Sequence, residues 1–217
     1  MYNVNEVFLS IQGEGLHVGQ PMVFVRFSGC NLSCDFCDTE HETGVDMSLD
    51  ELVAEVTARL RGEGHDPWAI PVCFTGGEPL LQVDHALVDA FQRQRFPVHI
   101  ETNGTMFPPV LNCFDVVTVS PKTLPPVRMR SETVRKFFTP SPGRLRVLKL
   151  LWCEVPTREF LTEMMTLWGH YPWNARYLQP ITYPDGTTNA LEVVAYLRSH
   201  PKWWRLSVQL HRMLSLR

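Results

Sequence analysis

Short apolar runs alternate with amphipathic segments along most of the chain. Helical spacing of apolar residues begins at Ser48, where Ser48 and Glu51 form a capping box, and recurs over 80–91, over about 157–170 and from Asn189 onward. Six apolar runs predict buried strands, and they cover residues 72–74, 98–100, 116–119, 145–150, 175–178 and 204–208. Strands that alternate with helices indicate a parallel sheet with right-handed crossovers.

The N-terminal part differs from this alternation. Residues 4–10 and 21–27 predict two strands, and the glycine-containing stretch 12–15 between them predicts a turn. A closed eight-stranded barrel typically needs about 250 residues, whereas this chain has 217. We therefore predict one domain over residues 1–217 with an α/β fold, a partial (open) TIM-like barrel of about six parallel strands. In such sheets the ligand binds beyond the carboxyl ends of the strands.

Composition narrows the classes of partner. The formal net charge is only −3 and the basic residues are dispersed, so we expect no nucleic-acid partner. The N-terminus lacks a signal-peptide pattern, and no stretch of about 20 apolar residues follows, so we expect no membrane partner and a cytoplasmic location.

Three of the six cysteines lie close together, directly after the apolar run 21–27. Cys30, Cys34 and Cys37 supply three soft thiolate ligands and leave one coordination position for another group. One alternative is a structural zinc site with His41 or a distant cysteine as the fourth ligand. Zinc loops usually bring a second pair of ligands, and no such pair is present in the sequence.

The spacing of these cysteines resembles that of the radical S-adenosylmethionine enzymes. The resemblance implies a radical S-adenosylmethionine core, with a [4Fe–4S] cluster held by Cys30, Cys34 and Cys37. S-adenosylmethionine would chelate the fourth iron and yield a 5'-deoxyadenosyl radical that removes hydrogen from the substrate. Because a sulfonium is hard to reduce and such clusters reach down to roughly −700 mV, the resemblance also implies a flavodoxin-like or ferredoxin-like reductant.

Polar motifs at the predicted strand ends match the same superfamily. The stretch 76–79 resembles its glycine-glycine-glutamate motif, where glycines let the backbone approach the methionine part of the cofactor. A turn before a helix is the alternative for 76–79, an Asn-Gly turn for 101–104 and a surface charge for Lys122. The resemblance places the following residues around S-adenosylmethionine: Phe36, Cys37, Asp38, Gly77, Glu78, Glu101, Thr102, Ser120, Pro121, Lys122 and Gln179.

Further stretches, 11–15, Arg26, Asp38-Thr39 and 207–217, are similar to the 7-carboxy-7-deazaguanine synthase family. That resemblance covers nearly the whole chain. It implies conversion of 6-carboxy-5,6,7,8-tetrahydropterin to 7-carboxy-7-deazaguanine with loss of ammonia, on the pathway to queuosine and related deazapurines. Many members carry an aromatic residue after the cysteine loop, where this chain has Glu42-Thr43-Gly44.

The chemistry of the candidate residues suits such a substrate. Polar groups such as Gln12, Glu14 and Thr75 can pair the donors and acceptors of a pterin edge, and the planar fork of Arg26 can bind its carboxylate. The resemblance assigns a magnesium ion to the hydroxyl of Thr39. It assigns the substrate to Ile11, Gln12, Gly13, Glu14, Arg26, Thr75, His211 and the terminal carboxylate of Arg217.

Each assignment has a structural alternative. Residues 12–14 could form a polar hairpin tip, Arg26 could lie on a strand surface, Thr39 could cap a turn and 209–217 could be a frayed terminus. The first rival function is a glycyl-radical-enzyme activating enzyme, which has the same cysteine spacing but a protein substrate. The second is a non-catalytic zinc-binding module. Because open sheets leave strand edges unpaired, we also expect a homodimer.

Overall fold

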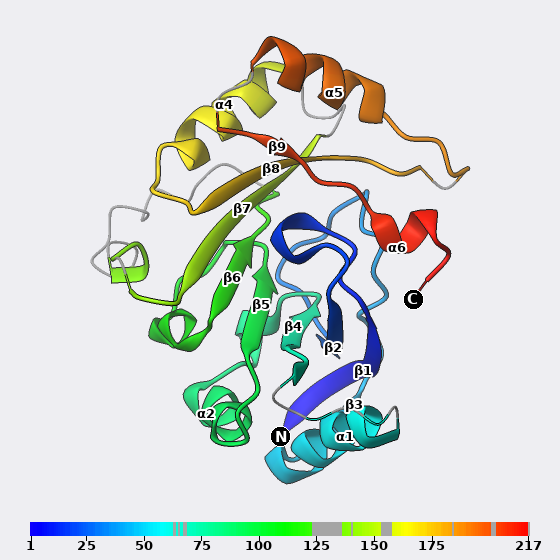
Figure 1. Ribbon diagram of the computed structural model, residues 1–217, viewed down its shortest axis with the longest axis vertical. Coiled ribbons are helices and arrows are strands. Elements are labelled where there is room, and N and C mark those ends of the chain that lie inside the picture. The colour runs from blue at the N-terminus through cyan, green and yellow to red at the C-terminus, as the bar shows by residue number, and fades with distance from the viewer. Residues whose placement is uncertain are drawn as a thin grey trace.

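The computed structural model describes residues 1–62, 64, 66, 69–122, 136–139, 141–152, 158–183, 185–200 and 203–216. These residues form one curved, nine-stranded sheet of order β3-β1-β2-β4-β5-β6-β7-β8-β9 (Figure 1). The strands are β1 (Tyr2–Ile11), β2 (Pro21–Phe27), β3 (Val45–Met47), β4 (Val72–Gly76), β5 (Val98–Thr102), β6 (Val116–Val119), β7 (Leu145–Trp152), β8 (Ala175–Pro180) and β9 (Arg205–Leu206).

The predicted α/β class with an open, mostly parallel sheet is confirmed. Each neighbouring pair from β2 through β4, β5, β6, β7 and β8 to β9 is parallel, which gives seven parallel strands where about six were expected. Strand β1 pairs antiparallel with both β2 and β3. The short strand β3 was not predicted, because Val45 and Asp46 are exposed and give no apolar pattern.

The four longest of the described α-helices cover the convex side of the sheet (Figure 1). The described α-helices are α1 (Leu49–Gly62), α2 (His85–Arg93), α4 (Arg158–Gly169), α5 (Ala190–Ser199) and α6 (Leu210–Met213), and the 3₁₀ turns are η1 (Gly15–His17), η3 (Pro79–Leu81) and η4 (Pro109–Cys113). Helix α1 begins as predicted. The backbone N–H of Ser48 donates to Glu51 Oε2 over 2.7 Å, and the N–H of Glu51 donates to Ser48 Oγ over 3.3 Å.

The helix predicted over 80–91 is wrong in its first part. Residues 79–81 form the 3₁₀ turn η3, and the α-helix α2 begins only at His85. The Asp84 side chain accepts a hydrogen bond from the backbone N–H of Leu87 over 2.9 Å, so it caps a separate helix. Apolar spacing alone could not separate the two, because Leu80 and Leu87 are both buried.

The loop between β1 and β2 enters the concave side of the sheet. Two backbone hydrogen bonds of 2.8 Å, Gln12 N–H to Gln20 O and Gly19 N–H to Gln12 O, close this loop on itself. Leu16 packs on a buried cluster formed by Val116, Val147, Ala175 and Tyr177. The loop therefore fills the interior of the open barrel beside β6, β7 and β8. It also brings Gln12 and Glu14 to the carboxyl ends of the strands.

The five cysteines in the described part are all free, while Cys153 lies outside it. None of the helices among the described residues is long and apolar enough to span a bilayer.

The end of β4 depends on glycine. Gly76 has φ +138°, and a Cβ there would collide with the backbone of Phe27 on β2. We expect Gly76→Ala to lower the free energy of unfolding by at least about 2 kcal/mol, because it combines backbone strain with a clash against main chain. Urea denaturation measures this change in the free energy of unfolding. Gly62→Ala is the matched control: its Cβ would meet open space, so stability should stay equal or rise. Equal stability of the two variants would contradict the prediction.

Candidate active site

One cavity of about 530 Å³ opens at the carboxyl ends of the parallel strands. The residues predicted from sequence that line it are Ile11, Gln12, Gly13, Glu14, Arg26, Cys30, Cys34, Phe36, Cys37, Asp38, Thr39, Thr75, Gly77, Glu101, Thr102, Ser120, Lys122, Gln179 and His211. Two predicted residues, Glu78 and Pro121, are not in its lining. Arg217 lies outside the described residues. Segments far apart in the sequence thus meet in one space.

The cysteine loop forms one end of the cavity. Its backbone is held by a 2.7 Å hydrogen bond from Gly29 N–H to His41 O and by a 3.0 Å bond from Cys37 N–H to Cys34 O. The backbone N–H of Leu32 also points at the Cys30 sulfur, 3.5 Å away. Such N–H donors stabilise thiolates that ligate iron.

The donor set of this loop fits an iron-sulfur cluster. Partial burial raises the pKa of the Cys34 thiol, and the neighbouring Cys37 and Cys30 raise it further, so metal binding would have to draw the proton off. Among the described residues, no three acidic, histidine or cysteine side chains converge to hold one metal ion. A cubane does not require such convergence, because each thiolate binds a different iron.

Two glycines hold the cysteine loop against the end of β4. A Cβ at Gly77 would collide with the backbone of Gly29, as one at Gly76 would with Phe27. Backbone hydrogen bonds tighten the contact: Gly77 N–H donates to Phe27 O over 3.1 Å and Glu78 N–H to Gly29 O over 2.9 Å. These glycines were expected to admit a ligand. In the structure, they also let the cysteine loop approach the sheet.

Glu78 lies beneath the cavity floor. Its side chain is fully buried and accepts hydrogen bonds from Leu80 N–H (3.0 Å), Thr102 Oγ1 (2.8 Å) and Asn103 N–H (2.7 Å). Burial raises the pKa of this carboxyl, and the three hydrogen bonds oppose that rise. The carboxylate thus joins the ends of β4 and β5. Its direct contact with the cofactor stays a prediction.

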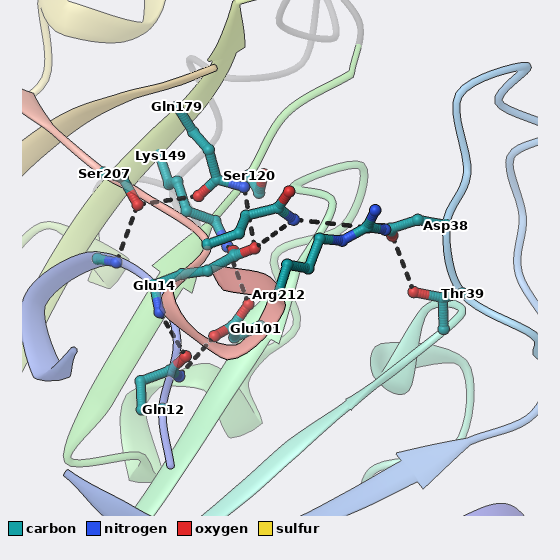
Figure 2. A network of polar contacts seen from close by, with 12 residues as sticks. Gln12, Glu14, Asp38, Thr39, Glu101, Ser120, Lys149, Gln179, Ser207 and Arg212 are labelled. Carbon is teal, nitrogen blue, oxygen red and sulfur yellow. Dashed lines mark hydrogen bonds and ion pairs between the residues drawn. The ribbon is translucent and has the colours of Figure 1, made fainter. Parts of the chain in front are cut away.

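A polar network forms the opposite wall of the cavity (Figure 2). The ammonium of Lys149 on β7 binds Glu14 Oε2 and, at 3.1 Å, Glu101 Oε2. Gln12 Nε2 donates to Glu101 Oε1 over 2.9 Å, and Gln12 Oε1 accepts from the Glu14 N–H over 3.0 Å. Gln179 Nε2 donates to Glu14 Oε1 over 2.9 Å. The network thus joins the β1–β2 loop to three strands.

Electrostatics fix the charge state of this network. Burial alone would raise the pKa of Glu14, but the charge and hydrogen bond of Lys149, with help from Gln209 and His211, outweigh it and lower that pKa to about 2. Burial would lower the pKa of Lys149, yet Glu101 and Glu14 hold it well above its ordinary value. Both groups are therefore charged across the physiological pH range.

Lys149 was missed as a site residue. It is a cation in the strand 145–150, which is otherwise mostly apolar, and this is the signal that singled out Arg26 in 21–27. Gln209 and Arg212, also missed, carry no comparable signal, because only the folded tail brings them to the cavity.

Arg26 is arranged to bind an anion. Its guanidinium lies 5.3 Å from the centroid of the Phe8 ring, which itself stacks on Phe24, and both rings line the cavity. Its nearest carboxylate, Glu6, is 3.9 Å away, a long ion pair. The buried Nε of Arg26 has no hydrogen-bond partner among the residues that the structure describes. A carboxylate on a bound molecule would satisfy it.

The C-terminal segment covers the network and is not frayed. Leu210 N–H donates to Gly13 O over 2.9 Å, and Gln209 Nε2 donates to Glu14 Oε1 over 2.9 Å. Arg212 pairs with Asp38 of the cysteine loop over 2.6 Å (Figure 2). Asp38 also accepts from Thr39 Oγ1 over 3.3 Å. The tail thus spans from the acidic wall to the cysteine loop.

Comparison with known proteins defines the class first. The family model described as "Radical SAM superfamily" matches residues 24–144, which include the cysteine loop and β4 to β6. The chain is 38% identical to the 7-carboxy-7-deazaguanine synthase of Bacteroides thetaiotaomicron over 100% of both chains. It is 37% identical to the one from Caulobacter vibrioides over 99% of both. The chain therefore belongs to the 7-carboxy-7-deazaguanine synthase family of radical S-adenosylmethionine enzymes.

Solved structures agree with this family assignment. The crystal structure of QueE from Escherichia coli matches with a TM-score of 0.68 and 26% identity, over 97% of this chain and 94% of that one. Streptococcus suis SuiB, at 14% identity and a TM-score of 0.56, shares the fold over 83% of this chain. The expected [4Fe–4S] cluster and S-adenosylmethionine, a small-molecule substrate and an external reductant follow from membership of the family.

The packing of His211 on Gly13 gives a test of the closed tail. A Cβ on Gly13 would lie 2.7 Å from the His211 Cγ and closer still to Nδ1, so the whole ring must move. In Gly13→Ala we expect the amides of residues 210–216 to exchange hydrogen about tenfold faster or more, with little change in global stability. Hydrogen exchange read by mass spectrometry measures this, with Gly62→Ala as the control. Unchanged protection of this segment would refute the prediction.

Proposed function

We propose that this chain converts 6-carboxy-5,6,7,8-tetrahydropterin to 7-carboxy-7-deazaguanine with loss of ammonia, on the pathway to queuosine and related deazapurines. The reaction is redox-neutral overall, because the product and ammonia together contain the same atoms and electrons as the substrate. The single observation that carries the proposal is the shared cavity, which is lined by the cysteine loop, by Arg26 and by the acidic wall that contains Glu14 and Glu101.

The residues at the cysteine end would hold the cofactors. Cys30, Cys34 and Cys37 would bind the cluster. S-adenosylmethionine would lie along the strand ends, against Phe36, Cys37, Asp38, Gly77, Thr102, Ser120, Lys122 and Gln179. The resemblance also places Glu101 at the cofactor, but its contacts with Lys149 and Gln12 put it in the same wall as Glu14, so we assign it to the substrate. Pro121 and Glu78 would shape this surface from outside the lining. When bound, the two groups together supply the one-electron chemistry that abstracts hydrogen from the substrate.

The opposite wall would recognise the pterin. Its pyrimidine edge presents ring N–H and amino donors, which need acceptors, and the carboxylates of Glu14 and Glu101 offer only acceptors. The Gln12 amide is engaged on both sides, so its part is to orient Glu101. Arg26 would bind the substrate carboxylate, and Ile11, Gly13, Thr75, His211 and Arg217 would complete the contacts. Buried polar groups left unpaired by an analogue would reject it by a factor of about 10⁴ when several are involved.

Magnesium, the reductant, the location and the assembly remain predictions. Thr39 would offer one oxygen to Mg²⁺, which often takes one or two protein groups and keeps several waters. A flavodoxin-like or ferredoxin-like protein would supply electrons at low potential. We expect a cytoplasmic location. We also expect a homodimer, because the edge strands β3 and β9 expose Val45 and Leu206.

Anaerobic reconstitution tests the proposal. After loading with iron and sulfide, the brown protein is given reductant, S-adenosylmethionine, Mg²⁺ and 6-carboxy-5,6,7,8-tetrahydropterin. We expect 5'-deoxyadenosine and a product lighter by one ammonia, both detected by mass spectrometry. Cys34→Ala, which lacks one thiolate, should lose cluster and turnover by a factor of at least about 10³.

Two outcomes would count against the proposal. Formation of 5'-deoxyadenosine without the lighter product would show that the pterin is not the substrate. Radical transfer to a protein partner in its place would favour a glycyl-radical-enzyme activating enzyme.

A further inference from the structure

A buried lysine separates two carboxylates in the cavity wall. The side chain of Lys149 is 7% exposed, and its ammonium contacts Glu14 of the β1–β2 loop and Glu101 of β5 (Figure 2). The two carboxylates are 13% and 22% exposed, and both line the cavity. One positive charge is therefore shared between two negative charges in a site largely shielded from water.

The two carboxylates differ in the acceptor capacity that they retain. An ionised carboxylate has about four acceptor sites. Glu14 accepts from Lys149, Gln179 and Gln209. Glu101 accepts only from Lys149 and Gln12 in the described part of the chain. The wall therefore has acceptor capacity left, most of it on Glu101, and that capacity exists only while both groups are ionised.

A direct acid–base role does not suit Lys149. An ammonium held between two carboxylates gives up its proton reluctantly, and this lysine has little contact with the cavity solvent. Its effect must reach the substrate through the groups that it holds.

We infer that Lys149 is a positioning residue that keeps Glu14 and Glu101 both ionised, so that the wall presents acceptors alone to the N–H edge of the pterin. This inference rests on the proposed function. Without the lysine, two carboxylates in one water-poor site would repel each other, and one would take up a proton. A protonated carboxyl is a donor, and it would face the donors of the substrate.

Other charged groups near the pair are few. His211 on α6 faces Glu14, and Gln209 links Glu14 to the Asp38–Arg212 ion pair. The buried thiol of Cys73 on β4 lies near both Glu101 and Lys149. The test therefore includes a His211 variant, so that a contribution of this side chain can be separated from that of the carboxylates.

The test compares Lys149→Met and Lys149→Arg with the wild-type holoenzyme, measuring kcat and KM for the pterin from pH 5.5 to 9. Wild-type KM should be flat. In Lys149→Met no cation separates the two carboxylates, so at low pH one of them should be protonated. KM should therefore be at least about tenfold higher at pH 6 and should fall as the pH rises. Lys149→Arg should restore the flat profile.

Arg146→Met is the matched control. Arg146 is a buried cation on the same strand, but its guanidinium bonds the Phe137 and Leu145 carbonyls away from the cavity. Its loss should lower stability and leave the pH profile of KM flat. A profile that changes in this control as it does in Lys149→Met would assign the effect to stability and overturn the inference.

Other results of the same experiment would also overturn the inference. A flat profile in Lys149→Met, whatever its KM, or no restoration by arginine would overturn the inference. If Lys149→Met does not take up a cluster, the wild type decides: a KM that rises below pH 6.5, and still does so in His211→Asn, would show that the wall is not held ionised. Absence of wild-type turnover with this pterin overturns the proposed function itself, whereas turnover with a flat Lys149→Met profile overturns only the role of the lysine.

Discussion

The ion triad of Lys149, Glu14 and Glu101 is the interaction on which the cavity depends. Removing a charge from water costs several kcal/mol, so a buried ammonium must be paired, and pairing it with two carboxylates fixes three segments relative to one another. Loop 12–20, β5 and β7 meet at this point. Such a triad contributes little net stability compared with apolar packing of the same volume. Its effect is to define one arrangement of the cavity wall.

The sheet supplies the other constraint. Parallel strands end at one edge, so the side chains at their carboxyl ends gather there whatever the intervening sequence. The close backbone contact of Gly76 with Phe27 then brings the cysteine loop to the same edge. The reacting groups and the recognition groups are therefore positioned by main-chain geometry first and by side-chain pairing second.

Much of this arrangement could be predicted from the sequence. Apolar runs and capping patterns are local, so the parallel sheet and the cap of α1 at Ser48 followed from them. The cysteines and strand-end motifs were local as well, and almost all of the predicted site residues line one cavity. The break between η3 and α2 was not predictable from apolar spacing, because Leu80 and Leu87 are both buried and only the Asp84 cap divides the two segments.

Contacts across long sequence separations could not be predicted. Lys149 pairs with a residue 135 positions earlier, and Arg212 with one 174 positions earlier. The sequence around Lys149 or Arg212 does not indicate with which residue either side chain pairs. For Glu78 the motif was recognised from the sequence, but its burial depends on hydrogen bonds from Thr102 at the end of β5 and from Asn103 directly after it.

The C-terminal tail shows what such contacts imply for motion. Helix α6 has only four residues and cannot be stable by itself. It is held by the Leu210–Gly13 and Gln209–Glu14 hydrogen bonds and by the half-exposed Arg212–Asp38 pair, which contributes at most about 1 kcal/mol. The sheet beneath buries many side chains completely. The tail must therefore open at a lower free energy than the sheet unfolds. Opening of the tail alone would let the cavity exchange its contents while the triad and the cysteine loop keep their geometry.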